Sequence, residues 1–247
     1  MARNSESGHA VNVANFDVLI ADITSYGATY NPSKASLKLA ALITLSTASK
    51  NAMNAVSTAV IAERLARNAR EAAFKPLSAL VTKSNNALKA TDTTAQIDAT
   101  AQSLVRKLQG RRATPKMTED EKKVASDTGV EVTNISSSQM GIDNRIENLN
   151  KYIKFLSSVP QYAPNEADLK TIALTAVLND LKAKNTAVVN AVVASDNARI
   201  ARSTTLYKDI SGLYDIALDI KTYIKSIFGA TSPQYKKISK LKFTKTR

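Results

Sequence analysis

Two pairs of arginines are the residues of this chain whose type and spacing best suit the binding of a ligand. Arg67 and Arg70 form one pair, and Arg199 and Arg202 form the other. Residues three apart are neighbours on a helix surface, so each pair of guanidinium groups could hold an anion. The alternative is that arginines near the C-terminal end of a helix complement its dipole and pair with acids such as Glu71. That interpretation needs no ligand, and the sequence favours it.

A second group of cations surrounds Gly110. It could contact phosphates as a basic patch, although a charged linker would have the same composition. No aromatic residues alternate with these cations, and no known nucleic-acid-binding motif is present. The pattern therefore does not predict sequence-specific recognition of a nucleic acid. The cations of this group are Arg106, Lys107, Arg111, Arg112 and Lys116.

The segment after Asp219 carries many lysines and no acid. Apolar residues alternate with the lysines, so the segment either docks on the rest of the protein or binds an anionic partner such as nucleic acid. We expect docking, because long lysine stems can cover apolar surface while their charges stay in water. The apolar residues are Tyr235, Ile238, Leu241 and Phe243, and the lysines include Lys236, Lys237, Lys240 and Lys242.

Catalytic signatures are missing from the sequence. His9 is the only histidine, there is no cysteine, and no nucleotide-binding loop, nucleophile elbow or zinc-binding motif occurs. The acidic residues do not cluster at helical spacing, which argues against a metal site. With aromatics at 5% of residues, an enclosed cofactor pocket is also disfavoured. We therefore predict no enzyme activity, no cofactor and no metal.

The elements that position these residues are predicted to be helices only. The chain has 247 residues, of which seven are glycine and six are proline, too few for many short strands and turns. No apolar run reaches the roughly 18 to 20 residues of a spanning helix, and the N-terminal segment does not resemble a secretory signal. We expect a soluble cytoplasmic protein. Its net charge of +13 permits nucleic acid, an anionic surface or an acidic protein as partner.

An internal repeat organises the chain. A shift of 132 positions aligns Tyr30-Asn31-Pro32 with Tyr162-Ala163-Pro164, and the match continues for about 40 residues. Shared alanines are weak support in an alanine-rich chain, but the tyrosine, proline, leucine-lysine and arginine matches in one register indicate a duplication. The two arginine pairs occupy equivalent positions, because Arg67 aligns with Arg199 and Arg70 aligns with Arg202.

Each repeat is predicted to contain a short helix, a long helix and a further short helix. Ser33 and Asn165 are suitable N-caps after each proline, and Asp168 suits a capping box. The long helices are expected at 33–74 and 165–206, each roughly 60 Å long. Apolar residues at helical spacing predict the preceding helices, and later helices are expected at 77–90 and 213–228. The spaced apolar residues are Phe16, Leu19, Ile20 and Ile23, and Leu149, Tyr152, Ile153 and Leu156.

The predicted division of the chain follows the repeat. Residues 1–109 form the first helical repeat, residues 110–138 a charged and polar linker, and residues 139–247 the second repeat with its basic tail. Two long helices with matching faces can join in one bundle. We therefore expect a single elongated helical bundle.

Alanines recur along both long helices at alternating steps of four and three. This is the heptad period, and small residues let two helices approach closely. We expect the two long helices to pack through this alanine seam, with a neighbouring stripe that includes Val56 and Val188 facing the short helices; the alternative is that alanine only propagates helix on a solvated face. The seam comprises positions 41, 45, 48, 52, 55, 59, 62, 66, 69 and 73, all alanine except Leu45, and Ala187, Ala191, Ala194, Ala198 and Ala201.

Several segments of the chain are distinctive: Gly8-His9-Ala10, Asn12 to Phe16, Tyr26 to Ser33, Tyr162 to Asn165, Ile227 to Lys236, and Leu241 to Phe243. They resemble a family of duplicated all-helical proteins from the Bacteroidetes. The resemblance covers most of the chain and is loosest in the linker; no activity, substrate or catalytic residue is assigned to that family. It implies a bacterial cytoplasmic protein and transfers no site.

Three functions are compatible with these patterns. The first is a structural or interaction protein that binds an unknown protein or a second copy of itself. The alternative is a nonspecific binder of nucleic acid or another polyanion through the basic tail and the cations around Gly110. A weaker third interpretation is a membrane-active helical protein that exposes 52–62 and 187–194 on rearrangement.

Overall fold

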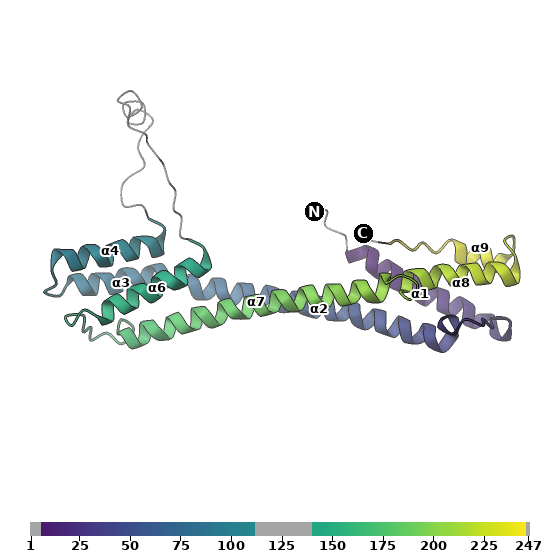
Figure 1. Cartoon of the computed structure of the whole chain (residues 1–247), viewed down its shortest axis with the longest axis horizontal. Helices are drawn as coiled ribbons and strands as arrows, with labels where there is room; N and C mark the ends of the chain where they lie inside the picture. The colour runs from purple at the N-terminus through teal and green to yellow at the C-terminus, as the bar shows by residue number, and fades with distance from the viewer. Residues whose placement is uncertain (1–5, 112–139, 246–247) are drawn as a thin grey trace, which may run out of the picture. The chain divides into compact units, whose positions relative to one another are not determined.

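The computed structural model describes residues 6–111 and 140–245, and these residues form helices and no strands (Figure 1). The predicted all-α fold and helical bundle are therefore confirmed. Two short 3-10 turns, Gly27–Thr29 and Ala35–Leu37, precede the first long helix. The α-helices are α1 (Glu6–Ser25), α2 (Leu39–Phe74), α3 (Leu77–Lys89), α4 (Ala95–Gln109), α6 (Ile142–Ser157), α7 (Thr171–Tyr207), α8 (Leu213–Phe228) and α9 (Pro233–Ser239).

The chain divides into two compact units. Unit 1 comprises Met1–Arg64 and Asn190–Arg247, and unit 2 comprises Leu65–Val189. Helix α1 packs on α8 in unit 1, and α4 packs on α6 in unit 2, so each unit combines helices from both predicted repeats. The compact units therefore do not coincide with the predicted repeats 1–109 and 139–247. The predicted linker lies almost entirely outside the described residues.

The long helices begin later than the predicted N-caps, Ser33 and Asn165. The Tyr30 hydroxyl donates a 2.7 Å hydrogen bond to the Leu37 carbonyl. Tyr162 and Leu169 form the same bond, also at 2.7 Å. These bonds hold each post-proline segment in a turn that buries the leucine, which delays α2 to Leu39 and α7 to Thr171. The predicted caps, including the capping box with Asp168, are therefore wrong.

The core of unit 1 is formed mainly by α1 and α8. Each of these helices turns a row of apolar side chains, spaced by three or four residues, toward the other, as amphipathic helices do. The adjoining ends of α2 and α7 contribute Leu42 and Leu206, both fully buried. The inward rows are Phe16, Leu19 and Ile23 on α1 and Leu213, Ile216, Ile220 and Ile224 on α8.

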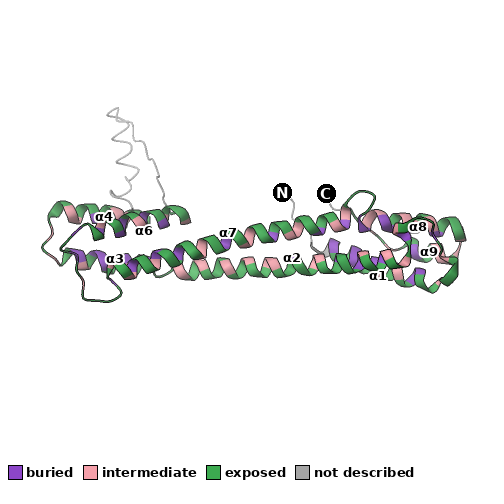
Figure 2. Ribbon diagram, turned by 60° about the horizontal axis from the view of Figure 1, so that its bottom comes forward, coloured by how far each residue is buried: buried purple, intermediate pink, exposed green. Residues whose placement is uncertain are grey.

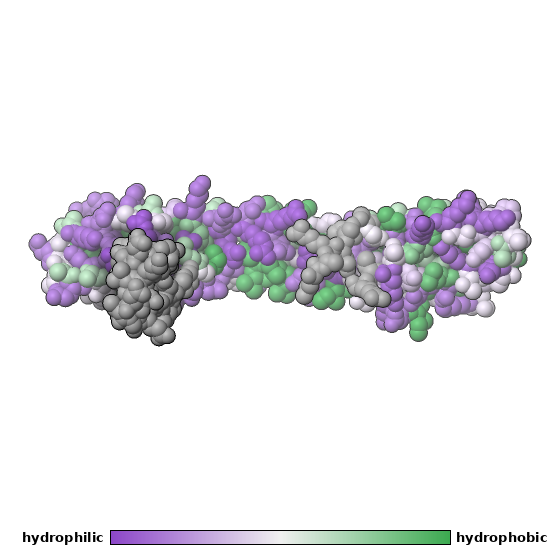
Figure 3. Space-filling view, turned by 90° about the horizontal axis from the view of Figure 1, so that it is seen from above, coloured by the Kyte–Doolittle hydropathy of each residue, from purple (hydrophilic) through white to green (hydrophobic). Residues whose placement is uncertain are grey.

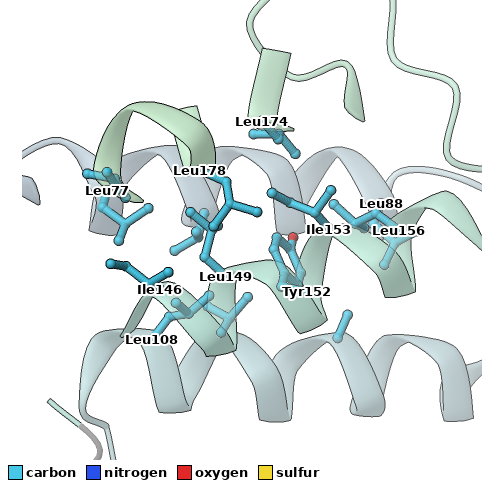
Figure 4. Close-up of a cluster of buried hydrophobic side chains, with 14 of the residues drawn as sticks. Leu77, Leu88, Leu108, Ile146, Leu149, Tyr152, Ile153, Leu156, Leu174 and Leu178 are labelled. Atoms are coloured by element: carbon cyan, nitrogen blue, oxygen red, sulfur yellow. The ribbon is translucent and has the colours of Figure 1, made fainter. Parts of the chain in front are cut away.

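The core of unit 2 gathers side chains from α3, α4 and α6 and from the start of α7 (Figure 4). Tyr152 is fully buried at its centre, although it carries a hydroxyl group. The helices predicted at 77–90 and 213–228 correspond to α3 and α8, and those predicted around Phe16 and Leu149 correspond to α1 and α6. Their apolar spacing identified the core-facing side correctly.

The alanine seam is only partly buried. Within it, positions 41, 45, 52, 59, 66 and 73 and Ala191 and Ala198 are half-buried, whereas the intervening alanines are exposed (Figure 2). The most buried residues in the middle of the long helices are Ser49, Val56, Val188 and Ser195. The covered face is thus centred beside the seam, because valine at 56 and 188 buries more apolar area than alanine. The predicted burial is wrong for Ala48, Ala55, Ala62, Ala69, Ala187, Ala194 and Ala201.

Candidate functional site

Arg67 and Arg70 line a pocket in unit 2. The pocket lies between the C-terminal end of α2 and the first turns of α6. Lys75 and Arg145 line it too, and Glu71 is the carboxylate beside these four cations. The arginine spacing predicted the first two, whereas Arg145 is far away in the sequence and no local spacing links it to α2.

The side chains of this basic pocket are held in place by neighbours. Arg70 donates a 2.8 Å hydrogen bond from Nη1 to Oδ1 of Asn185. Asn185 in turn donates a 2.9 Å bond to a carboxylate oxygen of Asp143. The guanidinium carbon of Arg145 lies 4.9 Å from the centre of the Phe74 ring, a cation-π contact. Burial lowers the pKa of Arg145, which nevertheless stays charged because an arginine pKa begins above 12.

The equivalent pair in unit 1, Arg199 and Arg202, is arranged differently. Arg199 donates a 2.9 Å bond to Asp196 and a 3.0 Å bond to Ser195. Ser195 also donates a 2.7 Å bond to a Glu63 carboxylate oxygen. Arg202 is buried, with 5% of its surface exposed. Arg199 is thus paired with an acid, and the two guanidinium groups do not form a shared opening like that in unit 2.

The basic patch around Gly110 is only partly described. Helix α4 ends at Gly110, whose φ of 68° is the left-handed conformation that glycine adopts easily. Arg106 is half-buried in the last turn, and Arg111 is exposed directly after the helix. Arg112 and Lys116 lie outside the described residues. The predicted patch therefore stays a prediction.

The C-terminal tail is docked on unit 1, as the sequence predicted. Ile238 is fully buried in the unit 1 core. Farther along, the Asn12 side chain forms two hydrogen bonds with the backbone of Thr244, at 2.8 and 3.0 Å. Asn15 donates a 2.7 Å bond to the Lys242 carbonyl. Tyr235, Leu241 and Phe243 are half-buried against the same core.

Some cations of this segment take part in docking, and others do not. Lys237 pairs with Asp22, which raises the lysine pKa. Lys245 pairs with Asp209 at 2.7 Å, with the same effect on its own pKa. Among residues 233–245, three further lysines are exposed and form no ion pair with any residue that the structure describes. They are Lys236, Lys240 and Lys242.

An exposed uncharged stripe runs along each long helix within unit 1. Its residues follow the heptad spacing of alternating three and four. Beside it, Ile61 is 59% exposed and Val193 is 52% exposed; hydrophobic side chains are visible on the molecular surface (Figure 3). The stripe comprises Ala48, Asn51, Ala55, Thr58 and Ala62 on α2, and Asn190, Ala194, Asn197, Ala201 and Thr204 on α7, all exposed.

Within the described ranges, no helix is long and apolar enough to cross a membrane. The same ranges hold no group of three histidine, cysteine, aspartate or glutamate side chains placed to bind a metal ion. The candidate sites are therefore the basic pocket, the docked tail and the exposed stripes.

Comparisons of the chain with protein-family models, with curated proteins and with solved structures found no match.

Proposed function

We propose that this chain is a non-enzymatic interaction protein that self-associates, with the exposed stripes of α2 and α7 packing on helices of a second copy. The observation that carries the proposal is the heptad spacing of exposed, uncharged residues on both helices of unit 1. In a soluble protein, a helix face directed at water normally carries charged residues.

The spacing supports a helix as the occupant. A repeat of 3.5 residues keeps one side of a helix facing a partner helix that winds around it. Alanine at Ala55, Ala62, Ala194 and Ala201 allows the two backbones to approach closely. A nucleic acid or a glycan would not require this period.

The charge distribution supports a second copy in particular. With a net charge of +13, two copies repel each other at most orientations. The stripes carry no charge, so the chains can meet there without placing like charges in contact. A polyanion would instead require cations on this face.

Apolar side chains beside the stripes would stabilise the contact. Ile61 and Val193 occupy equivalent positions in the repeat and are both more than half exposed. Full burial of such a side chain contributes about 1.5 to 3 kcal/mol. Asn51 and Asn190 lie in the stripes and would select the register, as a polar residue does in a coiled-coil seam.

The test is the oligomeric state of the full chain as a function of concentration, measured by sedimentation velocity. We expect reversible dimers, and we expect the double variant Ala62→Glu with Ala194→Glu to weaken dimerisation by more than about tenfold, or 1.4 kcal/mol. Ala21→Glu is the matched control, because Ala21 is an exposed helical alanine of unit 1 outside the stripes. A wild-type chain that stays monomeric at about 100 μM, a modest affinity threshold, contradicts the proposal.

Polyanion binding is the second candidate, favoured by the three exposed lysines without ion pairs. If Lys236, Lys240 and Lys242 each contact a phosphate, changing all three to glutamine reduces the slope of log affinity against log salt by about 2 to 3 on duplex DNA. The fold should survive, because these side chains are exposed. An unchanged slope, or no binding near physiological salt, rejects this candidate.

For the cellular location we propose the cytoplasm of a bacterium. The lack of cysteine is compatible with a reducing compartment. Fractionation of the native cell tests this location, and recovery of the protein outside the cytoplasm contradicts it.

A further inference from the structure

We propose that the basic pocket of unit 2 binds the phosphate group of a small phosphorylated ligand. The pocket lies between the end of α2 and the start of α6. This binding is independent of self-association, because none of the residues that carry it belongs to the exposed stripes.

The charge of the pocket selects an anion. Four cations line it, Arg67, Arg70, Lys75 and Arg145, against one carboxylate, that of Glu71. Guanidinium groups match the geometry of phosphate oxygens and form charge-assisted hydrogen bonds with them. The positive excess favours a doubly charged phosphate over a single carboxylate, because each added negative charge gains from the same cations.

Arg145 is prepared for such a ligand. Its guanidinium carbon lies over the Phe74 ring, 4.9 Å from the ring centre, and this contact holds the charged group at the pocket. Its Nε atom is buried and has no hydrogen-bond acceptor among the residues that the structure describes. A buried donor without an acceptor is unfavourable and uncommon in folded proteins. A phosphate oxygen would supply an acceptor to this arginine.

Arg70 is positioned without being neutralised. Its partner is the side-chain carbonyl of Asn185, at 2.8 Å, and an amide oxygen carries no charge. The Asn185 amide is oriented by its own bond to Asp143. Phe74 and Ile142 add an apolar part to the lining. This combination suits a ligand with a phosphate and an apolar or aromatic portion.

The equivalent arginines of unit 1 differ in their surroundings from those of the basic pocket. The arginine equivalent to Arg67 is Arg199, which is held by the carboxylate of Asp196. At the position equivalent to Asp196 the first repeat has Arg64 instead. The equivalent of Arg70 is Arg202, which is buried. The duplicated arginines thus have different surroundings: Arg67 and Arg70 line one pocket together, whereas Arg199 pairs with Asp196 and Arg202 is buried.

Calorimetric titration of the full chain at low salt with two probes, pyrophosphate and phenyl phosphate, tests the proposal, and inorganic phosphate and benzoate serve as reference ligands. We expect both to bind, phenyl phosphate more tightly than inorganic phosphate because of the apolar lining. Arg145→Gln and Arg67→Gln should each weaken binding by about tenfold or more. Arg199→Gln is the matched control, and binding by this variant should equal that of the wild type.

Thermal unfolding of each variant shows whether a loss of binding comes from a loss of folding. Arg67→Gln changes an exposed side chain, so this variant keeps the test valid if Arg145→Gln destabilises unit 2. Three results overturn the proposal: no binding of either probe at low salt, equal weakening by Arg199→Gln, and binding unaffected by Arg67→Gln in the folded protein. Equal affinity for benzoate and phenyl phosphate also overturns it, because the pocket would then select no phosphate.

Discussion

The two units fill the same place in their cores with different chemistry. In unit 2 the hydroxyl of Ser84 forms hydrogen bonds with the hydroxyls of Tyr152, at 3.0 Å, and Tyr162, at 2.9 Å. When the starts of α3 and α8 are aligned, Ser84 corresponds to Ile220 of unit 1, which is fully buried and apolar. When the apolar rows that begin at Leu149 and Phe16 are aligned, Tyr152 corresponds to Leu19, which is also fully buried.

The difference shows two ways of specifying one arrangement of helices. Hydrogen bonds between buried hydroxyls have strict geometry, so those in unit 2 fix the positions of α3 and α6. Burial also raises the pKa of both tyrosines, which keeps them neutral donors. Unit 1 has an apolar centre, and its polar contacts lie outside that centre; in one of them the Tyr207 hydroxyl meets His9 at 2.7 Å and Asn12 at 3.1 Å.

Removal of the tail is the change whose effects on unit 1 and unit 2 should differ most. Truncation after Gly229 takes away Ile238 and the backbone partners of Asn12 and Asn15. Loss of one buried isoleucine alone costs about 2 to 5 kcal/mol. We expect unit 1 to unfold and unit 2 to keep its structure, giving about half of the helical circular dichroism. A truncated chain with an unchanged unfolding curve contradicts this prediction. The full chain with glutamine in place of Lys236, Lys240 and Lys242 is the control, because it loses positive charge without losing the docked residues.

A smaller effect is expected from Ser84→Ala, which acts only on unit 2. The change leaves the buried Tyr152 hydroxyl without its partner, whereas Tyr162 keeps its bond to the Leu169 carbonyl. We expect a loss of about 1 to 3 kcal/mol in the free energy of unfolding, measured with urea. Ser78→Ala, at an exposed position of α3, should change it by less than about 0.5 kcal/mol. Equal effects of the two variants would show that the hydroxyl network does not stabilise unit 2.

The shared tyrosine bond offers a finer comparison. Tyr30→Phe and Tyr162→Phe each remove the hydroxyl that donates to a leucine carbonyl. A typical hydrogen bond contributes about 0.5 to 1.5 kcal/mol. We expect Tyr162→Phe to cost more, because its hydroxyl also meets Ser84 and its side chain is more buried. Amide hydrogen exchange shows in which unit the stability is lost. A larger loss of stability from Tyr30→Phe than from Tyr162→Phe would contradict this prediction.

The smallest effect concerns alkaline pH in unit 1. Burial raises the pKa of Tyr30 to about 12, from 10.0 for an unperturbed tyrosine. A raised pKa means that the folded state holds the proton more tightly, so the stabilisation is complete below pH 10 and is lost as pH rises toward about 12. Absorbance titration at the tyrosinate band checks this. Tyr30→Phe should remove one late-titrating group, and an unchanged titration curve contradicts the assignment.

The sequence predicted the helices and their inward faces because apolar spacing is a local signal. It identified Phe16, Leu149 and Ile238 as core residues or docking residues for that reason. The start of each long helix was misplaced because the bond from Tyr30 to Leu37 competes with capping by Ser33, and tertiary burial decides the outcome. Arg145 was missed because only folding brings α6 next to the end of α2.

The order in which the two units occur along the chain has a consequence for synthesis on the ribosome. Unit 2 is one continuous segment, whereas unit 1 joins the first part of the chain to the last. The contact between Asn12 and Thr244 joins residues that are 232 positions apart in the sequence. Contacts between residues far apart in the sequence form slowly. At ribosomal rates α1 waits about 10 to 40 s for α9 to appear. During that interval Phe16, Leu19 and Ile23 lack their native partners on α8 and in the tail, so this apolar face of α1 is open to contacts with other molecules until the end of the chain is made.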